Sequence, residues 1–103
     1  MKLHDIAHAR TGDKGDTSNI SVIAYDPANW SLIREAVTAA RVAAHFGTFR
    51  ESSVTRYEVP QLHALNFVIR GALTGGVTRS LALDAHGKCL ASVLLDMDIP
   101  SAS

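Results

Sequence analysis

Apolar and polar residues alternate near the start of the chain, and this pattern predicts two β-strands. Residues 3–9 place Leu3, Asp5 and Ala7 on one face and the histidines and isoleucine between them on the other. Residues 18–25, SNISVIAY, are rich in β-branched and apolar side chains, which is typical of a second strand. A polar segment, which we expect to be a loop, joins the two.

The next segment has the apolar spacing of a helix. Asp26 followed by Pro27 is a helix start, because an oxygen-bearing cap precedes a residue whose fixed φ suits the first turn. Thr38 is placed to cap a second helix, and Gly47 to end it. The apolar residues that share one helical face are Trp30, Ile33, Val37, Ala40 and Ala44.

The second half of the chain predicts further strands. Residues 54–59 form one, ended by Pro60, which cannot donate to a ladder. Residues 65–70 fit a buried strand, although a helix starting at Pro60 also satisfies the pattern. A glycine loop at 71–76 then leads to an alternating strand over 78–84.

The last segment fits two structures. One is a hairpin that turns at residues 86–87, and the other is a helix capped by Asp84. Leu90 and Leu94 lie four apart, which favours a helix to about residue 93. We therefore expect a helix followed by a closing strand over 95–99, where apolar residues alternate.

These elements predict a single α+β domain over residues 1–103. Their order contains the βαββαβ pattern of a ferredoxin-like sandwich, with an extra N-terminal strand and an inserted strand near 78–84.

Composition narrows the classes of partner. Ten basic residues balance ten acidic ones, so the net charge offers no attraction for nucleic acid or an anionic membrane. No apolar run approaches the ~18 residues of a membrane-spanning helix, and the first residues lack the apolar core of a signal peptide. The single cysteine, Cys89, fits a reducing compartment. We expect a cytoplasmic protein with neither nucleic acid nor membrane as its partner.

The segment ARTGDKGDTSNI, residues 9–20, is the strongest candidate for chemistry. Gly12 and Gly15 can adopt positive φ and expose successive amide N–H groups as an anion-binding nest. Arg10 offers a planar fork and Lys14 a mobile point charge. The segment therefore predicts a site for a carboxylate or a phosphate.

A structural interpretation of the same segment stays open. Asp13 and Asp16 cancel the charges of Arg10 and Lys14, so an anion has to be held by directed donors. The alternative is a glycine loop with exposed ion pairs, each contributing ~0 to 1 kcal/mol.

A second glycine loop is expected to face the first, with Asn66 and Arg79 nearby. Asn66 interrupts an apolar strand, so its amide either orients a ligand or ties down loop backbone. The candidate ligand-binding or interface residues are Arg10, Thr11, Gly12, Asp13, Lys14, Gly15, Asp16, Asn19, Asn66, Gly75, Gly76 and Arg79.

Other chemistry finds little support. His4 and His8 are separated by roughly 13 Å along a strand, too far to share a metal. Asp96 and Asp98 are typical of a solvated edge, and no serine lies in a G-x-S-x-G elbow. We predict no metal and no cofactor, assign no catalytic residue, and leave open whether the chain is an enzyme.

Three stretches carry a family resemblance: ARTGDKGDTSNISVIAYDP, ALNFVIRGALTGGVTRSLALDAHGK and the closing LLDMDI. Together they resemble the ferredoxin-fold domain associated with the acyclic terpene utilisation AtuA family, over essentially the whole chain. In that family the domain usually follows a much larger AtuA domain, whereas we expect this chain to be a separate small protein.

The resemblance implies a small subunit that docks on a large AtuA-like partner in bacterial breakdown of acyclic terpenoid or branched acyl-CoA compounds. It supplies no catalytic residue. Two other possibilities remain: a purely structural docking or oligomerising module, which includes a homodimer, and an independent small-molecule binder or enzyme.

Overall fold

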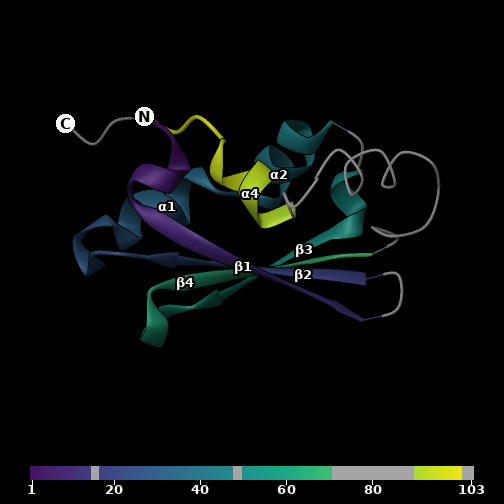
Figure 1. The fold of residues 1–103 in the computed structure, drawn as a ribbon, viewed down its shortest axis with the longest axis horizontal. Helices are drawn as coiled ribbons and strands as arrows, with labels where there is room; N and C mark the ends of the chain where they lie inside the picture. Colours follow the sequence, from purple (N-terminus) through teal and green to yellow (C-terminus); the bar gives the residue numbers. More distant parts are fainter. Residues whose placement is uncertain (15–16, 48–49, 71–89, 101–103) are drawn as a thin grey trace.

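A four-stranded antiparallel sheet is the frame of the molecule (Figure 1). The computed structural model describes residues 1–14, 17–47, 50–70 and 90–100. The strands lie in the order β1-β2-β4-β3, and the three α-helices that are described cover one face, so the class is α+β and ferredoxin-like as predicted. The strands are β1 (Ala7–Lys14), β2 (Thr17–Ala24), β3 (Val54–Val59) and β4 (Ala64–Ile69), and the helices are α1 (Trp30–Ala36), α2 (Ala39–Phe46) and α4 (Leu90–Leu95).

The helical segment is divided by its capping residues. The Asp26 carboxylate accepts a hydrogen bond from the amide of Ala28 at 2.9 Å, at a short 3-10 turn that leads into α1. The Thr38 hydroxyl accepts from the amide of Arg41 at 3.2 Å and starts α2. Gly47 ends α2 with a φ of 74°, the left-handed conformation that glycine adopts without strain. The predicted start, break and end are all confirmed.

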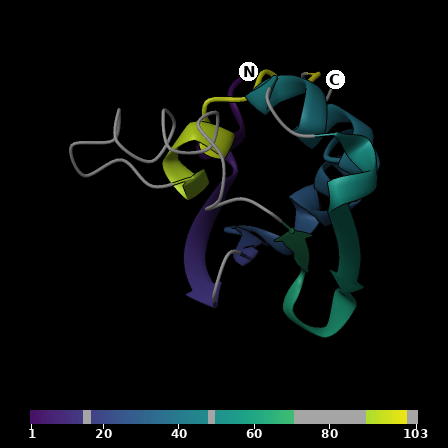
Figure 2. The same cartoon turned by 90° about the vertical axis from the view of Figure 1, so that its right-hand side faces the viewer.

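The core lies between the helices and the covered face of the sheet (Figure 2). Alternate residues of the two central strands point into it, because successive side chains of a strand point to opposite faces. The fully buried residues of these strands are Ser18, Ile20, Val22, Leu65, Phe67 and Ile69.

The first strand begins later than predicted. Leu3–Asp5 form a 3-10 turn, and β1 runs from Ala7 to Lys14. Leu3 is held away from the sheet because its amide donates to the carbonyl of Met97 at 2.9 Å and its side chain is fully buried. The predicted strand over 3–9 was therefore partly wrong. The polar segment expected as a loop between the first two strands, residues 10–17, is called the polar block from here on, and much of it belongs to β1.

The second pair of strands agrees closely with the prediction. β3 spans the expected residues, and β4 begins and ends one residue earlier than expected. The alternative helix from Pro60 does not form, since Pro60–Leu62 is a single 3-10 turn closed by His63 at a φ of 50°. The glycine loop at 71–76 and the inserted strand near 78–84 lie outside the described residues.

The C-terminal segment neither closes the sheet nor forms a strand, so the strand predicted over 95–99 was wrong: Leu95 ends α4, and Asp98 makes only an isolated bridge to Lys2. The alternation of its side chains is real, since Met97 and Ile99 are buried and Asp96 and Asp98, which alternate with them, are exposed. β1, however, already occupies the edge beside β2. The segment pairs with the N-terminus instead, where the Ile99 amide donates to the carbonyl of Met1 at 2.8 Å.

The preceding helix is confirmed where it is described. α4 extends to Leu95, two residues beyond the predicted end, so a hairpin arm does not form over its residues. The expected cap at Asp84 and the turn at 86–87 lie outside the described residues.

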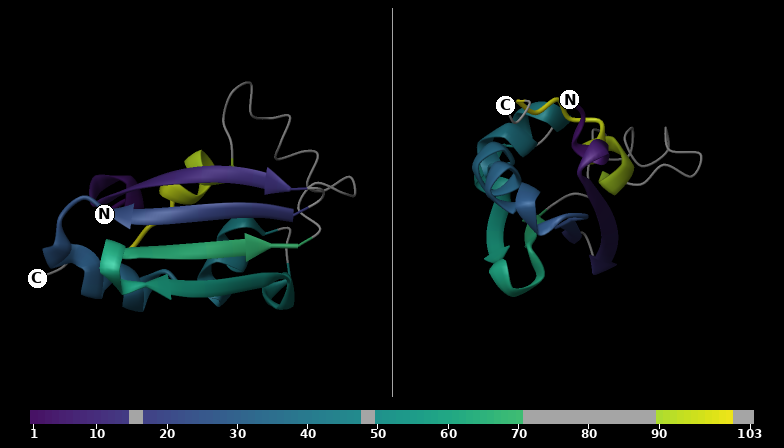
Figure 3. Two further views of the ribbon diagram at one scale, coloured as in Figure 1. Left: turned by 90° about the horizontal axis from the view of Figure 1, so that it is seen from below. Right: turned by 90° about the vertical axis from the view of Figure 1, so that its left-hand side faces the viewer.

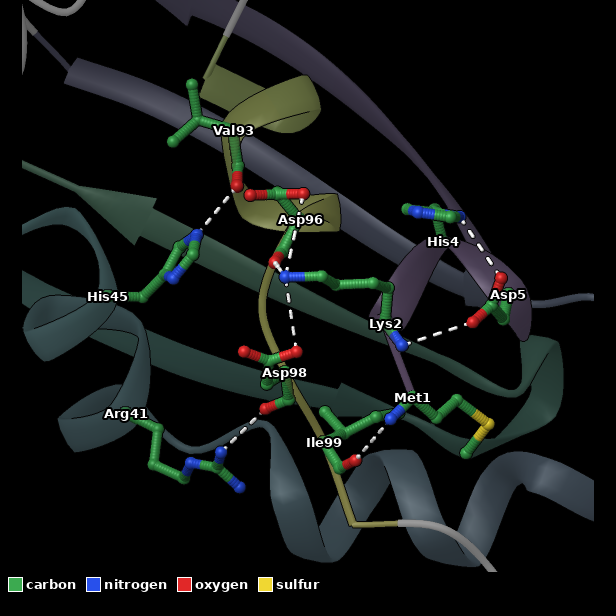
Figure 4. Close-up of polar contacts among 10 residues, drawn as sticks. All are labelled: Met1, Lys2, His4, Asp5, Arg41, His45, Val93, Asp96, Asp98 and Ile99. Atoms are coloured by element: carbon green, nitrogen blue, oxygen red, sulfur yellow. Dashed lines mark hydrogen bonds and ion pairs between the residues drawn. The ribbon is translucent and has the colours of Figure 1, made fainter.

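Polar contacts join the two ends of the chain to α2 (Figure 4). The Lys2 amine lies 3.1 Å from Asp98 Oδ1 and 3.9 Å from Asp96 Oδ1. The Arg41 guanidinium donates to the Asp98 carbonyl at 2.8 Å, and His45 Nε2 lies 2.7 Å from the Val93 carbonyl oxygen. The hydrogen bond to Asp98 raises the pKa of Lys2 above its ordinary 10.5; partial desolvation opposes this shift, and the aspartate charges reinforce it.

The contacts of Lys2 with the C-terminal aspartates predict that the stability of the fold depends on pH. A pKa raised in the folded state means that the Lys2 contribution to stability is complete below pH 10.5 and is lost as the pH rises through the folded pKa. We expect the difference in urea midpoint between the natural chain and Lys2→Met to be constant from about pH 8 to 10 and to shrink above about pH 11. A difference that grows with alkaline pH contradicts the assignment.

Candidate functional site

One face of the sheet is left uncovered by the helices that the structure describes. Seen from below, the four strands lie in front and the described helices lie behind them (Figure 3, left). Because Ser18, Ile20 and Val22 are buried in the core, Asn19 and Ser21 between them point to the opposite face. No helix or strand in the described parts of the chain covers this face, which we call the open face.

The open face carries a depression of about 720 Å³ between β1, β2 and β4. Arg10 is the one charged residue among the described residues that line it. The lining residues are Arg10, Thr11, Gly12, Thr17, Asn19, Ser21 and Asn66.

Strand register explains why these residues meet. Arg10 lies opposite Ser21, and Ser21 lies opposite Asn66, so the three form a row across three strands. Gly12 lies opposite Asn19 in the next row on the same face. Directly opposed residues have Cβ atoms about 4.5–5.5 Å apart, within reach of one small ligand.

Arg10 is exposed and unengaged. Its guanidinium makes no hydrogen bond or ion pair with any other residue that the structure describes. Arg56, by contrast, donates to the Arg34 carbonyl at 3.0 Å and to Glu58 Oε2 at 2.9 Å. Arg70 donates to Thr55 Oγ1 at 3.2 Å, so of these three arginines only Arg10 has its donors free.

A side-chain hydrogen bond fixes the amide of Asn66. The Ser21 hydroxyl donates to Asn66 Oδ1 at 3.1 Å, across two neighbouring strands. The Asn66 NH₂ group has no hydrogen-bond partner within the described ranges and remains a donor. The sequence predicts that Asn66 either orients a ligand or ties down loop backbone. The hydrogen bond that the structure describes goes to a side chain, so this bond does not tie down loop backbone.

Thr11, which follows Arg10 in β1, makes its hydrogen bond on the helical side of the sheet. Thr11 Oγ1 accepts a hydrogen bond from the amide of Ala91, in the first turn of α4, at 3.0 Å. Thr11 also borders the depression, but its hydroxyl is used on the helical side. Ser18 is fully buried and does not line the depression.

Gly12 does not form the predicted nest. Among the described glycines only Gly47 has a positive φ; Gly12 is extended, because it pairs with Asn19 in the ladder. That part of the prediction was wrong, and Gly15 lies outside the described residues. A Cβ added at Gly12 meets no atom within 4 Å, so the space above it is empty.

The structure places the remaining candidates only in part. Asp13 and Lys14 lie in β1, with their backbones opposite Ser18 and Thr17. Sequence reasoning missed Ser21, although its position two residues after Asn19 in a strand was the signal for a shared face. The candidates outside the described residues are Gly15, Asp16, Gly75, Gly76 and Arg79.

The two N-terminal histidines lie apart and have separate neighbours. His4 Nδ1 is 3.3 Å from Asp5 Oδ1, and the His8 ring stacks on Tyr25 with centroids 5.2 Å apart. Within the described ranges no three histidine, cysteine or acidic side chains are arranged to hold a metal ion. Those ranges also contain no helix whose length and apolar character suffice to span a membrane.

The difference between the arginines is testable by stability. We expect Arg10→Ala to change the free energy of unfolding by less than ~0.5 kcal/mol, because it removes an exposed side chain and no hydrogen bond or ion pair within the described residues. Arg56→Ala removes the hydrogen bonds to the Arg34 carbonyl and Glu58 and should cost roughly 1–2 kcal/mol. Urea denaturation of both variants measures this, and an equal loss contradicts the view that Arg10 is free.

The contact between Thr11 and α4 gives a second prediction. Thr11→Val keeps the shape but leaves the Ala91 amide without its acceptor, which should cost roughly 1–3 kcal/mol in urea denaturation. Thr11→Ser keeps the acceptor and is the matched control. Equal destabilisation by the two variants contradicts a specific role for the hydrogen bond.

Comparison with known protein families gives a match over nearly the whole chain. The family model described as the AtuA ferredoxin-like domain matches residues 1–100. Neither the curated proteins nor the solved structures contain a match to the chain.

Proposed function

This chain belongs to the AtuA ferredoxin-like domain family, and from that membership we propose that it is an accessory subunit of an AtuA-like system. Such a system acts in bacterial catabolism of acyclic terpenoid or branched acyl-CoA compounds. The subunit docks on a large AtuA-like protein in the cytoplasm, and its polar block lies at an anion site or at the subunit interface.

The observation that carries this proposal is the open face with its free arginine. A sheet that is packed on one side presents the other side to solvent or to a partner, and here that side bears the Arg10 depression. Ligand sites occur preferentially at interfaces between domains or subunits, where a second surface completes the enclosure. A large partner placed over the open face would convert the depression into an enclosed site.

A second candidate is a docking or oligomerising module without a ligand. An exposed aromatic residue favours this candidate. Tyr57 of β3 is 52% exposed and lies opposite Asn66 of β4, in the same cross-strand row as Arg10. Tyrosine is enriched in protein interfaces because its ring buries a large area and its hydroxyl still finds a partner. If the chain is such a docking module, the open face contacts the large partner or a second copy of the chain.

Titration of the large partner tests the proposal. Co-purification from the native host first identifies the partner, and its catalytic activity is then measured against added small subunit. We expect Arg10→Ala and Lys14→Ala to raise the concentration needed for half-maximal activation, or to lower the maximum, by about tenfold or more.

Arg34→Ala is the matched control, because Arg34 is an exposed arginine on α1, on the covered side of the sheet. It should leave activation unchanged. Normal partner binding with lost activation by Arg10→Ala supports an anion site. Normal binding with full activation removes the chemical role of the polar block and leaves the docking module, and the lack of any partner defeats both.

A further inference from the structure

We propose that the depression above Gly12 binds the carboxylate of a small organic acid, with the Arg10 guanidinium as its counter-charge. This inference deepens the proposed function, on which it rests for the metabolic source of the acid. The binding itself is a property of this chain and is testable without the partner.

The first argument concerns Gly12. It lies inside β1 in extended conformation, opposite Asn19, where any residue is allowed and a β-branched residue is preferred. Glycine at such a position weakens a strand and often marks a place where a ligand approaches the backbone. Since a Cβ there meets nothing within 4 Å, the missing side chain keeps the depression open above the backbone.

The second argument concerns hydrogen-bonding groups. Arg10 presents free N–H donors, and the Asn66 NH₂ is oriented because its carbonyl oxygen is engaged by Ser21. The Asn19 amide and the Thr17 hydroxyl border the same space. No carboxylate is among the described lining residues, so these residues present one positive charge and several donors, which suits an anion.

The third argument selects the anion. A single guanidinium fork matches the two oxygens and the single charge of a carboxylate. A phosphate group carries close to two charges and three acceptor oxygens, which one arginine does not balance. Lining residues Asn19, Ser21 and Asn66 are neutral, so a monoanion is the better match.

The fourth argument makes the ligand organic. Val68 lies opposite Asn19 on β4, and it points to the open face because Phe67 and Ile69 on either side are buried. Ile23 follows Ser21 by two residues on β2 and therefore points to the same face. These half-buried residues lie just outside the lining of the depression, in the rows on either side of Arg10, so a short carbon chain attached to a carboxylate at Arg10 can lie over one of them.

The experiment uses three probes with the isotope-labelled chain in solution. They are 3-methylbutanoate, its neutral primary amide, and inorganic phosphate, each titrated while the side-chain amide signals of Asn19 and Asn66 and the Arg10 Nε–H signal are followed by NMR. We expect the acid to shift these signals saturably, and the amide and phosphate to bind at least tenfold more weakly. An amide that binds as well as the acid, tighter binding of phosphate, or no saturable shift with the acid overturns the proposal.

Substitution at Gly12 separates space from conformation. We expect Gly12→Val to fold with an unchanged or higher thermal midpoint, because φ is already extended, and to bind the acid at least tenfold more weakly. Gly12→Ala should lie between, Arg10→Gln should lose binding without loss of stability, and Arg34→Gln is the control that retains it.

Full affinity in a folded Gly12→Val defeats the inference. If that variant fails to fold, the Gly12→Ala and Arg10→Gln measurements decide in the same way. Because these titrations contain no partner protein, they can fail while the activation experiment succeeds, and the reverse also holds.

Discussion

The structure depends on the continuous antiparallel pairing of β1 with β2, from Ala7 opposite Ala24 to Lys14 opposite Thr17. A strand has a side-chain period of two, so this register assigns every second residue of β1 to the core and the others to the open face. Ala7 and Thr11 therefore contact the helical layer, while Arg10 lines the depression. A shift of one residue would exchange these roles, burying the guanidinium and exposing the hydroxyl that α4 requires.

The same strand determines how the chain closes. In a ferredoxin-like sheet the edge beside the first core strand is a single position, and here β1 fills it from the N-terminal side. The C-terminal segment is left to pair with residues 1–3, through the Leu3 amide to the Met97 carbonyl and the Ile99 amide to the Met1 carbonyl. These bonds, the Lys2–Asp98 ion pair and the contact of Thr11 with α4 hold α4 against β1. The helical layer and the open face are thus organised by one strand.

Local chemistry determined the parts of the fold that the sequence predicts well. Asp26, Thr38 and Gly47 act on backbone groups within a few residues, so the divided helix was predictable from them. The end of β3 was predictable because Pro60 lacks the amide N–H that a strand ladder needs, and this does not depend on tertiary packing. The start of β1 and the place of residues 95–99 were not predictable, because both depend on the contact between Leu3 and Met97, which are far apart in the sequence but neighbours in space.

The candidate site shows the same division between local and distant information. Its residue types were evident in the polar block, and five of the predicted residues line the depression: Arg10, Thr11, Gly12, Asn19 and Asn66. The extended conformation of Gly12 was not evident from the sequence, because a glycine among charged residues normally predicts a turn with positive φ. Only the pairing with Asn19 shows that the backbone is extended, and this changes the reason for glycine from conformation to space.

Gly47 and Gly12 illustrate two different costs. At Gly47 any other residue would be strained at a φ of 74°, so folding alone accounts for it. At Gly12 folding alone favours a larger residue, since glycine in a strand loses more chain entropy and packs no side chain. Local choices that oppose stability are concentrated at functional positions, where another requirement prevails. Gly12 lies beside the free Arg10 and the oriented amide of Asn66, and in the proposed carboxylate site access to those donors is the requirement that outweighs the stability of the strand.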